Sequence, residues 1–512
     1  MPAPVRGASA LVTEKREFKA IKGTRDILPP DSALWNWFEQ TARDVFESYN
    51  FRDIRLPVME EAQLFARSVG IDTDIVSKEM FTFQDRPFGL QGPKNFNDLD
   101  RYIKEIEELL SGGQIPNDKD NRTTLDLLKV TTTDLNLALK EQKISSLSGE
   151  FFELFYHIDS LRLGDELVLR PEATASVARA YIEHGMQTLP GNVKLYYMGP
   201  MFRRERPQKG RYRQFYQIGA EVLGQSDAPA IDAEVLEMLV VFFKRVGLTR
   251  TTLYVNSIGC KECRPKYVEV LREKLREVKG ELGPDSQRRI DTNPLRVLDS
   301  KLPEEQAIIA KLPRISDHLC ADCLEHFAKL KEELNMRGVA YEENWRLVRG
   351  LDYYTRTTFE VTAEGLGSQN AVCGGGRYDG LVELLGGTPT KGIGFAIGSD
   401  RAILSIQEGG KLPHLSGLAV FVAWMGQAAY PTAVNITRKL RAAGLSVELP
   451  PEEMKFKKSL GLADKLGARY ALIIGEDEVA AGTFTLKRLA DSEQNKLSEY
   501  ELLEYLESEQ RR

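Results

Sequence analysis

Hydrophobic residues recur at two spacings along the chain, and the spacing separates predicted helices from predicted strands. Between residues 32 and 49, apolar side chains repeat every three or four positions, which predicts an amphipathic helix after Pro29 and Pro30. Residues 51–58 (FRDIRLPV) alternate between apolar and polar, which predicts a strand that ends near Pro57. The same rules predict further helices at residues 64–70, 99–110, 174–184 and 230–246, and further strands at residues 80–84, 166–170 and 253–258.

The stretch from Lys194 to Gly224 predicts two strands joined by a short polar loop at residues 206–210. Six of the eleven residues from Arg203 to Arg213 are Lys or Arg, a density that favours a polyanionic ligand. Because side chains alternate across a strand, one face of the hairpin is predicted to carry the ligand-binding side chains, here called the chemical face, and the other to join the core. The chemical face holds Arg211, Arg213, Phe215, Gln217 and Glu221, and the core face holds Tyr212, Tyr216, Ile218 and Val222.

The side chains of the chemical face suit a nucleotide and an amino acid bound together. Guanidinium groups bind phosphate through forked donors, an aromatic ring stacks on a base, and an amide with a carboxylate can accept an ammonium group. A solvated, basic sheet face would give the same pattern, so the hairpin alone leaves both interpretations open.

Further polar and glycine-rich motifs stand at predicted strand ends. Glu172 and Thr174 mark a change from strand to helix, a position that often meets a ligand. RGLDYY (349–354) is too polar for a core strand, and the glycines at 374–376 let a backbone approach a ligand. Glycines at 392, 394 and 398 predict a smooth shelf over which Arg401 reaches. The structural alternatives are helix capping for Thr174, a sharp turn at the glycine run, and a packed strand-to-helix turn at residues 391–401.

Four of the five cysteines form two C-x-x-C pairs, Cys260 with Cys263 and Cys320 with Cys323. Two pairs at this spacing are typical of a zinc site. The pairs are further apart than in compact zinc ribbons, so four reduced thiols are the alternative.

Composition limits the class of protein. A length of 512 residues suggests roughly three domains, and 42% hydrophobic residues allow sizeable cores. The net charge of −6 gives no overall attraction to nucleic acid, so an RNA partner would need local basic patches. The chain shows no signal-peptide pattern and no run of about 18 apolar residues, so we expect a soluble, cytoplasmic protein without membrane contact.

Residues 417–505 alternate between strand and helix patterns, which predicts a sheet of parallel strands flanked by helices. Lys455, Phe456, Lys457 and Lys458 form a basic cluster with one aromatic ring. Such a cluster is typical of an RNA-binding surface, and a solvated helix start is the alternative.

Five motifs together resemble the histidyl-tRNA synthetase family of class II aminoacyl-tRNA synthetases: the strand ending near Pro57, FRRERPQKGRYRQF (202–215), RGLDYY (349–354), GGGRYDGL (374–381) and GIGFAIGSDR (392–401). The resemblance covers about residues 18–86 and 164 to the C-terminus, and RGLDYY followed by GGGRYDGL is specific to the histidine branch. It implies an α+β catalytic domain with an antiparallel sheet flanked by helices, and a C-terminal α/β anticodon-binding domain.

The implied organisation is an N-terminal extension at 1–17, a catalytic domain at 18–86 and 164–410, and an anticodon-binding domain at 416–512. Residues 87–163 form an inserted subdomain without an assigned role, and residues from about 260 to 325 form a second, helical insertion. Asp400 also departs from the family, in which a glutamate is more usual before the residue corresponding to Arg401.

The resemblance implies roles for individual residues. ATP would contact Arg203, Glu205, Arg211, Arg213, Phe215 and Arg401. Histidine would contact Glu172, Ala173, Thr174, Arg203, Gln217, Glu221, Arg349, Tyr353 and Tyr354. Arg203 and Arg349 would be the catalytic cations, and Gln208 and Lys209 would approach the tRNA.

The implied reaction activates L-histidine with ATP and Mg²⁺ to histidyl-adenylate, and then transfers histidine to the 3′ end of tRNA(His). The family also implies a homodimer. One alternative is a non-catalytic regulatory subunit of ATP phosphoribosyltransferase, which would be expected to lack the arginines and the C-terminal domain present here. A class II synthetase for another amino acid conflicts with the histidine-specific motifs.

Overall fold

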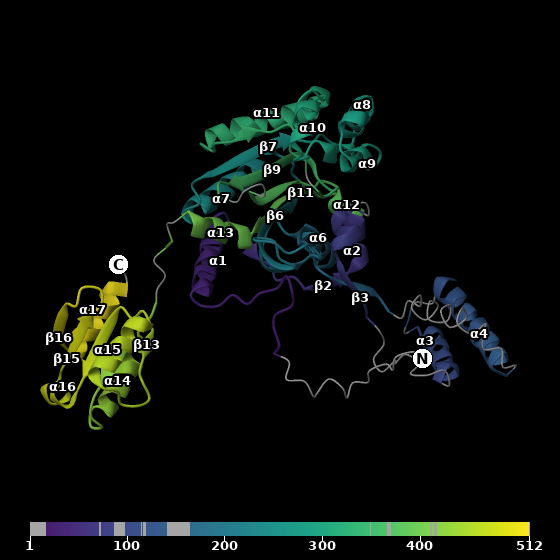
Figure 1. Ribbon diagram of the computed structural model, residues 1–512. Helices are drawn as coiled ribbons and strands as arrows, with labels where there is room; N and C mark the ends of the chain where they lie inside the picture. The colour runs from purple at the N-terminus through teal and green to yellow at the C-terminus, as the bar shows by residue number, and fades with distance from the viewer. Residues whose placement is uncertain are drawn as a thin grey trace. The chain divides into compact units, whose positions relative to one another are not determined.

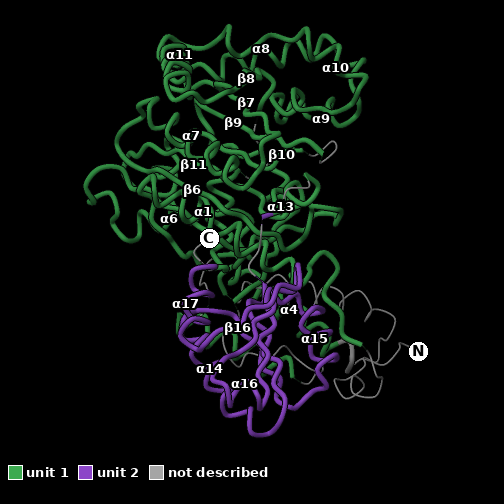
Figure 2. Tube along the Cα trace, turned by 90° about the vertical axis from the view of Figure 1, so that its left-hand side faces the viewer, with its two compact units in different colours: residues 1–412 green, residues 413–512 purple. Residues whose placement is uncertain are grey.

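The computed structural model divides the chain into two compact units, Met1–Leu412 and Pro413–Arg512 (Figure 2). The structure describes residues 17–70, 73–85, 98–113, 115, 119–140, 164–348, 350–365, 370–409, 412–413 and 417–510. Among these residues, no helix is long and apolar enough to cross a lipid bilayer. Arg349, the N-terminal extension up to residue 16 and much of the 87–163 insertion fall outside the described residues.

The first unit is built on an eight-stranded sheet in the order β1-β5-β6-β11-β10-β9-β7-β8 (Figure 1). Neighbouring strands are antiparallel except for two parallel pairs, β1 with β5 and β7 with β8, at the two edges. The expected α+β class is therefore confirmed. The strands are β1 (Arg52–Asp53), β5 (Val193–Phe202), β6 (Gln214–Gly224), β7 (Thr251–Ser257), β8 (Glu342–Glu343), β9 (Thr355–Ala363), β10 (Ala371–Arg377) and β11 (Lys391–Gly398).

Helices α1 (Asp31–Ser48) and α7 (Pro229–Arg245) pack on one face of this sheet. The ring of Phe46 in α1 contacts Phe242 of α7 in a tilted arrangement and Phe395 of β11 edge-on, with ring centroids 5.8 and 5.9 Å apart. Helix α13 (Ser399–Glu408) follows β11 directly. Because neighbouring residues of a strand face opposite sides, Phe395 on the helix side leaves Gly394 and Ala396 on the other side.

A smaller sheet, in the order β2-β4-β3, contains β2 (Met59–Glu61), β3 (Phe81–Gln84) and β4 (Glu166–Leu169). The strand predicted at residues 51–58 is wrong in extent, because only Arg52–Asp53 pairs as β1. The carbonyl oxygens of Leu56 and Pro57 instead accept hydrogen bonds from the Arg170 guanidinium, at 2.8 and 3.0 Å. Nearby are α2 (Ala62–Val69), the π-helix η2 (Ile75–Glu79), α6 (Thr174–Glu183), η5 (Met186–Thr188) and α12 (Leu381–Leu384).

Both segments that were predicted to be insertions contain helices in their described residues. The first contains α3 (Leu99–Ser111), as expected, and also α4 (Lys119–Lys140), which was not predicted because five threonines obscure its apolar period. The two helices share a small apolar core. The second contains α8 (Cys263–Glu277), η6 (Lys279–Glu281), α9 (Pro284–Thr292), η7 (Pro294–Val297), α10 (Pro303–Ile309), η8 (Ile315–His318) and α11 (Ala321–Met336).

The second unit has its own five-stranded sheet, in the order β13-β12-β14-β15-β16, and its own buried core. Strands β13, β12 and β14 are parallel as expected, but β15 and β16 are antiparallel. The chain between β14 and β15 is too short for a parallel crossover. The elements are β12 (Val420–Trp424), α14 (Tyr430–Ala442), β13 (Val447–Glu448), α15 (Phe456–Lys465), β14 (Tyr470–Ile474), α16 (Glu476–Ala481), β15 (Thr483–Arg488), β16 (Gln494–Ser498) and α17 (Glu499–Gln510).

Candidate active site

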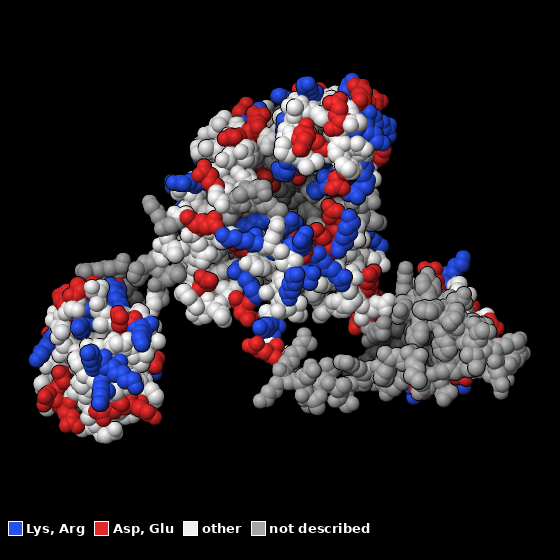
Figure 3. All heavy atoms as spheres, viewed as in Figure 1, with Lys and Arg blue, Asp and Glu red and all other residues white. Residues whose placement is uncertain are grey.

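One pocket of the first unit brings together most of the predicted site residues. It opens on the sheet face that carries Ala396 and Gly398, and in Figure 3 Lys and Arg side chains gather around a hollow in this unit. Ten predicted residues line the pocket: Glu172, Thr174, Arg203, Glu205, Arg211, Phe215, Gln217, Tyr353, Tyr354 and Arg401.

The other predicted residues do not line this pocket. Ala173 and Glu221 are buried, and Arg213 packs elsewhere. Gln208 and Lys209 are exposed in the loop between β5 and β6, where Lys209 Nζ donates to Glu408 Oε1 at 2.8 Å. Arg349 lies outside the described residues.

Three guanidinium groups and one aromatic ring form the cationic half of the pocket. The Arg203 guanidinium lies over the Phe215 ring, 5.2 Å from its centroid, and Arg203 Nε donates to Pro171 O at 2.9 Å. Arg401 Nε donates to Gly210 O at 3.3 Å, and burial together with the nearby Arg211 lowers the pKa of Arg401. Arg211 pairs with Glu205. A bound anion would relieve the repulsion among these cations.

The predicted alternation of the hairpin fails before Gln214, where β6 begins. Residues 203–213 form an irregular loop, longer than the one predicted at 206–210, and Gln208 and Arg211 close a tight turn within it. Tyr212 therefore lines the pocket, whereas Arg213 is held at Gly23, whose carbonyl oxygen accepts from Arg213 N at 2.7 Å. Strand alternation applies only to residues inside a ladder.

Asp400 holds the cationic half in place. One carboxylate oxygen accepts from Arg25 at 2.7 Å, and the other accepts from the backbone N–H of Tyr216 at 2.9 Å. The Arg25 guanidinium also lies 4.5 Å from the centroid of the Tyr212 ring. Both oxygens of the Asp400 carboxylate are thus hydrogen-bonded, one to the N-terminal segment and the other to β6.

Carboxylate and hydroxyl groups form the other half of the pocket. Glu172 accepts hydrogen bonds from the backbone N–H groups of Thr174 and Ala175, at 2.8 and 3.0 Å, and so caps the start of α6. Tyr353 Oη donates to Glu172 Oε2 at 3.5 Å. Burial raises the pKa of Glu172, and the neighbouring Arg203 opposes this effect.

Glu221 stands directly behind the pocket wall. Thr174 Oγ1 and Tyr378 Oη each donate to its carboxylate at 2.7 Å, and burial raises its pKa to about 8. Tyr378 lies in the GGGRYDGL motif but was not singled out from the sequence, because its contact joins residues 157 positions apart.

The glycines of β11 do not form the predicted shelf for a ligand. A Cβ at Gly392 would lie 2.2 Å from the Tyr378 ring, and one at Gly394 would lie 1.7 Å from Glu221 Oε2. Only Gly398 of the three lines the pocket. The missing side chains therefore make room for Tyr378 and Glu221.

Three buried polar atoms of pocket-lining residues have no hydrogen bond within the described chain: Tyr197 Oη, Gln217 Oε1 and Arg211 Nε. Of these, Arg211 Nε still has an ion-pair partner, Glu205. Tyr197 was not predicted from the sequence. It pairs with Gly219 across the β5–β6 ladder, and a Cβ at Gly219 would lie 2.2 Å from its ring. A tyrosine opposite a glycine in the hairpin was the available signal.

The four paired cysteines converge although 60 residues separate the pairs. Their sulfur atoms all lie within 4.8 Å of one another. Three of the separations are 3.7 Å (Cys260 to Cys263), 3.8 Å (Cys260 to Cys320) and 3.9 Å (Cys263 to Cys323). No histidine belongs to this cluster among the described residues.

Comparison with known protein families gives two matches. Residues 139–263 and 265–402 match the sequence profile described as histidyl-tRNA synthetase. Residues 419–509 match the profile described as anticodon binding domain.

Similar proteins cover almost the whole chain. The histidine–tRNA ligase of Koribacter versatilis is 46% identical over 492 residues, which are 95% of this chain and 96% of that protein. The histidine–tRNA ligase of Solibacter usitatus is 45% identical over 491 residues, covering 96% and 99% of the two chains. The crystal structure of apo histidyl-tRNA synthetase from S. aureus is similar with a TM-score of 0.67 at 31% identity, covering 96% of this chain and all of that chain.

Proposed function

This chain belongs to the histidyl-tRNA synthetase family, and on that premise we propose how its pocket performs the reaction. The protein is a histidine–tRNA ligase, which activates L-histidine with ATP and then transfers it to tRNA(His). The non-catalytic regulatory alternative has less support, because relatives up to 46% identical over nearly the full length are histidine–tRNA ligases by name.

We assign histidine to the half of the pocket that holds Glu172, Thr174, Gln217 and Tyr353. The unpartnered Gln217 Oε1 is the observation that carries this assignment, because an ammonium group is a donor that it needs. Glu221 and Tyr354 are our candidates for the imidazole. Thr174 both lines the pocket and donates to Glu221, so a ring nitrogen that displaces this hydroxyl would reach the carboxylate.

This arrangement would select histidine through hydrogen bonds. An amino acid without ring nitrogens would leave buried polar groups unpaired, and such groups discriminate more strongly than pocket size does.

ATP would occupy the cationic half. Phe215 would stack on the adenine, while Arg203, Arg211 and Arg401 would contact phosphates. The side chain of Arg213 packs against Gly23 instead, so we assign it to holding the loop.

The first step needs no base, because the histidine carboxylate is already ionised. It attacks the α-phosphorus in line, the bond to the bridging oxygen breaks, and pyrophosphate leaves. Arg203, together with Arg349, would stabilise the negative charge of the transition state. Both carboxylate oxygens of Glu172 and of Asp400 accept hydrogen bonds from protein donors. Glu205 pairs with Arg211 through one oxygen, so its other oxygen would be offered to Mg²⁺, which would neutralise phosphate charge.

In the second step, a hydroxyl of the terminal ribose of the tRNA attacks the adenylate carbonyl and AMP leaves. Glu172 or the phosphate of the adenylate would accept the proton. The exposed Gln208 and Lys209 stand in the loop that borders the pocket, where they would approach the acceptor end. We place this reaction in the cytoplasm.

Pyrophosphate exchange into ATP, driven in turn by each amino acid, tests the activation step. We expect exchange with histidine alone. Absence of exchange with histidine, at saturating ATP and Mg²⁺, would falsify the assignment. Charging of tRNA(His) with labelled histidine checks the second step.

We propose a homodimer. Apolar side chains of the N-terminal part of the first unit are exposed to solvent: Phe18, Ile21, Leu28, Val58 and Met59. A partner subunit would cover such a surface. Sedimentation equilibrium should give twice the chain mass, and a monomer at micromolar concentration would contradict the proposal.

We also propose that the four cysteines hold one structural Zn²⁺. A tetrahedral site with Zn–S bonds of about 2.3 Å places its sulfurs about 3.8 Å apart. Three of the six separations, 3.7 to 3.9 Å, fit this value, and all four sulfurs lie within 4.8 Å of one another. Metal analysis of the purified protein should find one zinc per chain.

A further inference from the structure

The turn that carries Cys260 and Cys263 is also bonded to a segment of the proposed histidine pocket. It connects β7 to α8, and Cys320 and Cys323 lie at the start of α11. The segment on the other side is residues 353–356, which enters β9. Tyr353 and Tyr354 of this segment line the pocket.

Four hydrogen bonds join the turn to the segment. Arg264 Nη1 donates to Tyr354 O at 2.6 Å. The carbonyl oxygen of Gly259 accepts from Arg356 N at 2.9 Å and from Thr355 Oγ1 at 3.2 Å. Ile258 N donates to Arg356 O at 2.8 Å. Each residue from 354 to 356 is therefore tied to the cysteine turn.

The backbone of this segment needs such support. Arg356 has a φ of 52°, a left-handed conformation that a side chain with a Cβ disfavours. Its guanidinium is held by Asp227 Oδ2 at 2.8 Å. A conformation of this kind persists only where the surrounding contacts fix it.

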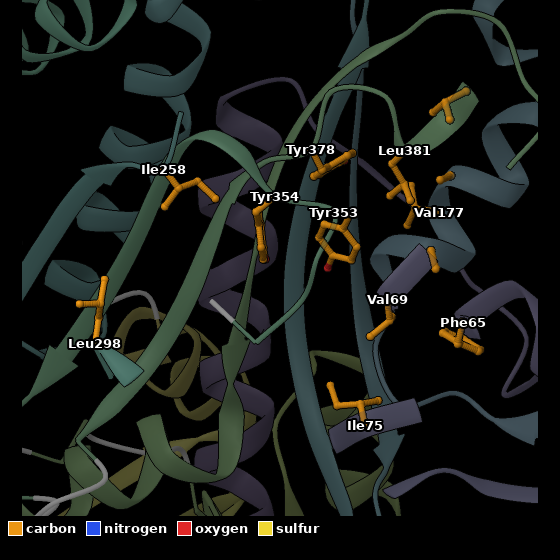
Figure 4. Close-up of a cluster of buried hydrophobic side chains, with 14 of the residues drawn as sticks. Phe65, Val69, Ile75, Val177, Ile258, Leu298, Tyr353, Tyr354, Tyr378 and Leu381 are labelled. Atoms are coloured by element: carbon orange, nitrogen blue, oxygen red, sulfur yellow. The ribbon is translucent and has the colours of Figure 1, made fainter. Parts of the chain in front are cut away.

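The cysteine turn is itself tightly built. Gly259 has a φ of 71°, and a Cβ there would lie 2.8 Å from Cys263 Sγ. The Gly259 carbonyl that supports Arg356 therefore lies in the same short turn as two of the clustered sulfur atoms, those of Cys260 and Cys263. Figure 4 shows Ile258 beside Tyr354, with Tyr353 and Tyr378 next in the same buried cluster.

We propose that the metal-loaded cysteine cluster positions Tyr353 and Tyr354 in the histidine pocket, with Arg264 as the positioning residue that transmits its geometry. The inference rests on the proposed zinc and on the proposed histidine pocket. Zinc would fix the turn, the turn fixes Gly259 O and the Arg264 guanidinium, and these hold the segment. Among the described residues, Gly259 and Arg264 do not line the pocket and so form no part of its ATP half.

Arg264→Gln tests this link without removing a cysteine, and Lys266→Gln is its matched control. Lys266 is exposed on the same turn of α8, so both variants remove one cation. We expect one zinc per chain in both. Losing the 2.6 Å bond should raise the KM for histidine in pyrophosphate exchange about tenfold, with the KM for ATP unchanged. An unchanged KM for histidine in Arg264→Gln would overturn the proposal.

Histidine binding to the wild-type protein, measured by calorimetry without ATP, gives a readout apart from activity. Zinc removal by a chelator should weaken histidine binding, and added Zn²⁺ should restore it. A purified protein that contains no metal and binds histidine equally with and without added Zn²⁺ would overturn the inference. Histidine-dependent exchange by that same protein would leave the ligase assignment standing.

Discussion

Glu221 is a carboxyl group in the core of the first unit, with 0% of its surface exposed. Burial raises its pKa to about 8, from an ordinary value of 4.5. Between these two pH values the folded protein holds a proton that the unfolded chain has released. The free energy of unfolding therefore falls as pH rises across this window, by up to about 1.4 kcal/mol per pH unit from this group.

The variant Glu221→Gln should remove that pH dependence. A thermal unfolding series from pH 5 to pH 8 should show a smaller loss of stability in the variant than in the wild-type protein. Equal slopes would mean that Glu221 titrates at an ordinary pH. The variant should also lose histidine-dependent exchange, because an amide, unlike a carboxyl group, cannot release a proton to a bound ring nitrogen.

Gly394 and Gly398 lie on the same strand and differ in what a methyl group would meet. At Gly394 the new carbon would lie 1.7 Å from Glu221 Oε2, whereas at Gly398 the nearest atom, Val372 O, is 3.9 Å away. Gly394→Ala should lower the free energy of unfolding by about 1–3 kcal/mol, the cost of overpacking a core. Gly398→Ala should stay close to wild type, and a larger loss in Gly398→Ala would contradict the packing described for β11. Denaturant unfolding of both variants measures the difference.

At the scale of elements, regular periodicity predicted well and long-range contacts did not. Phe215 and Gln217 lie inside β6, and alternation placed both on one face, as observed. Tyr212 and Arg213 precede the strand, so the same rule predicted the wrong location for each of them. The packing of Glu221 against Gly394 and Tyr378 brings together β6, β11 and the residue after β10. No single stretch of sequence contains that information.

Helix α15 presents its N-terminal lysines to solvent. Lys455, Lys457 and Lys458 are exposed together with Phe456. Replacing the three lysines by alanine should raise the KM for tRNA and reduce the slope of log affinity against log salt by about 2, since each phosphate contact to single-stranded RNA contributes about 0.7. Pyrophosphate exchange should be unchanged.

Lys465 provides the control, because it is an exposed lysine at the other end of α15. Its alanine variant should bind tRNA normally. Equal weakening by both changes would point to overall charge as the cause.

At the scale of the whole molecule, the two units have separate sheets and separate cores. All residues that line the candidate pocket belong to the first unit. A chain that ends at Leu412 should therefore retain histidine-dependent exchange. Its charging efficiency should fall roughly 10²-fold or more, because a second tRNA-binding module is lost. Single-turnover transfer from preformed adenylate measures this loss, and a truncated chain that charges tRNA normally would argue against the second unit as a tRNA-binding module.

The ion pair between Arg25 and Asp400 spans 375 positions of the chain. During synthesis on the ribosome, Arg25 emerges early and Asp400 only after about four-fifths of the 512 residues have been added. Polypeptides released prematurely before that point cannot form the support beneath Tyr216 and Arg401. Interrupted translation would therefore yield fragments unable to consume ATP.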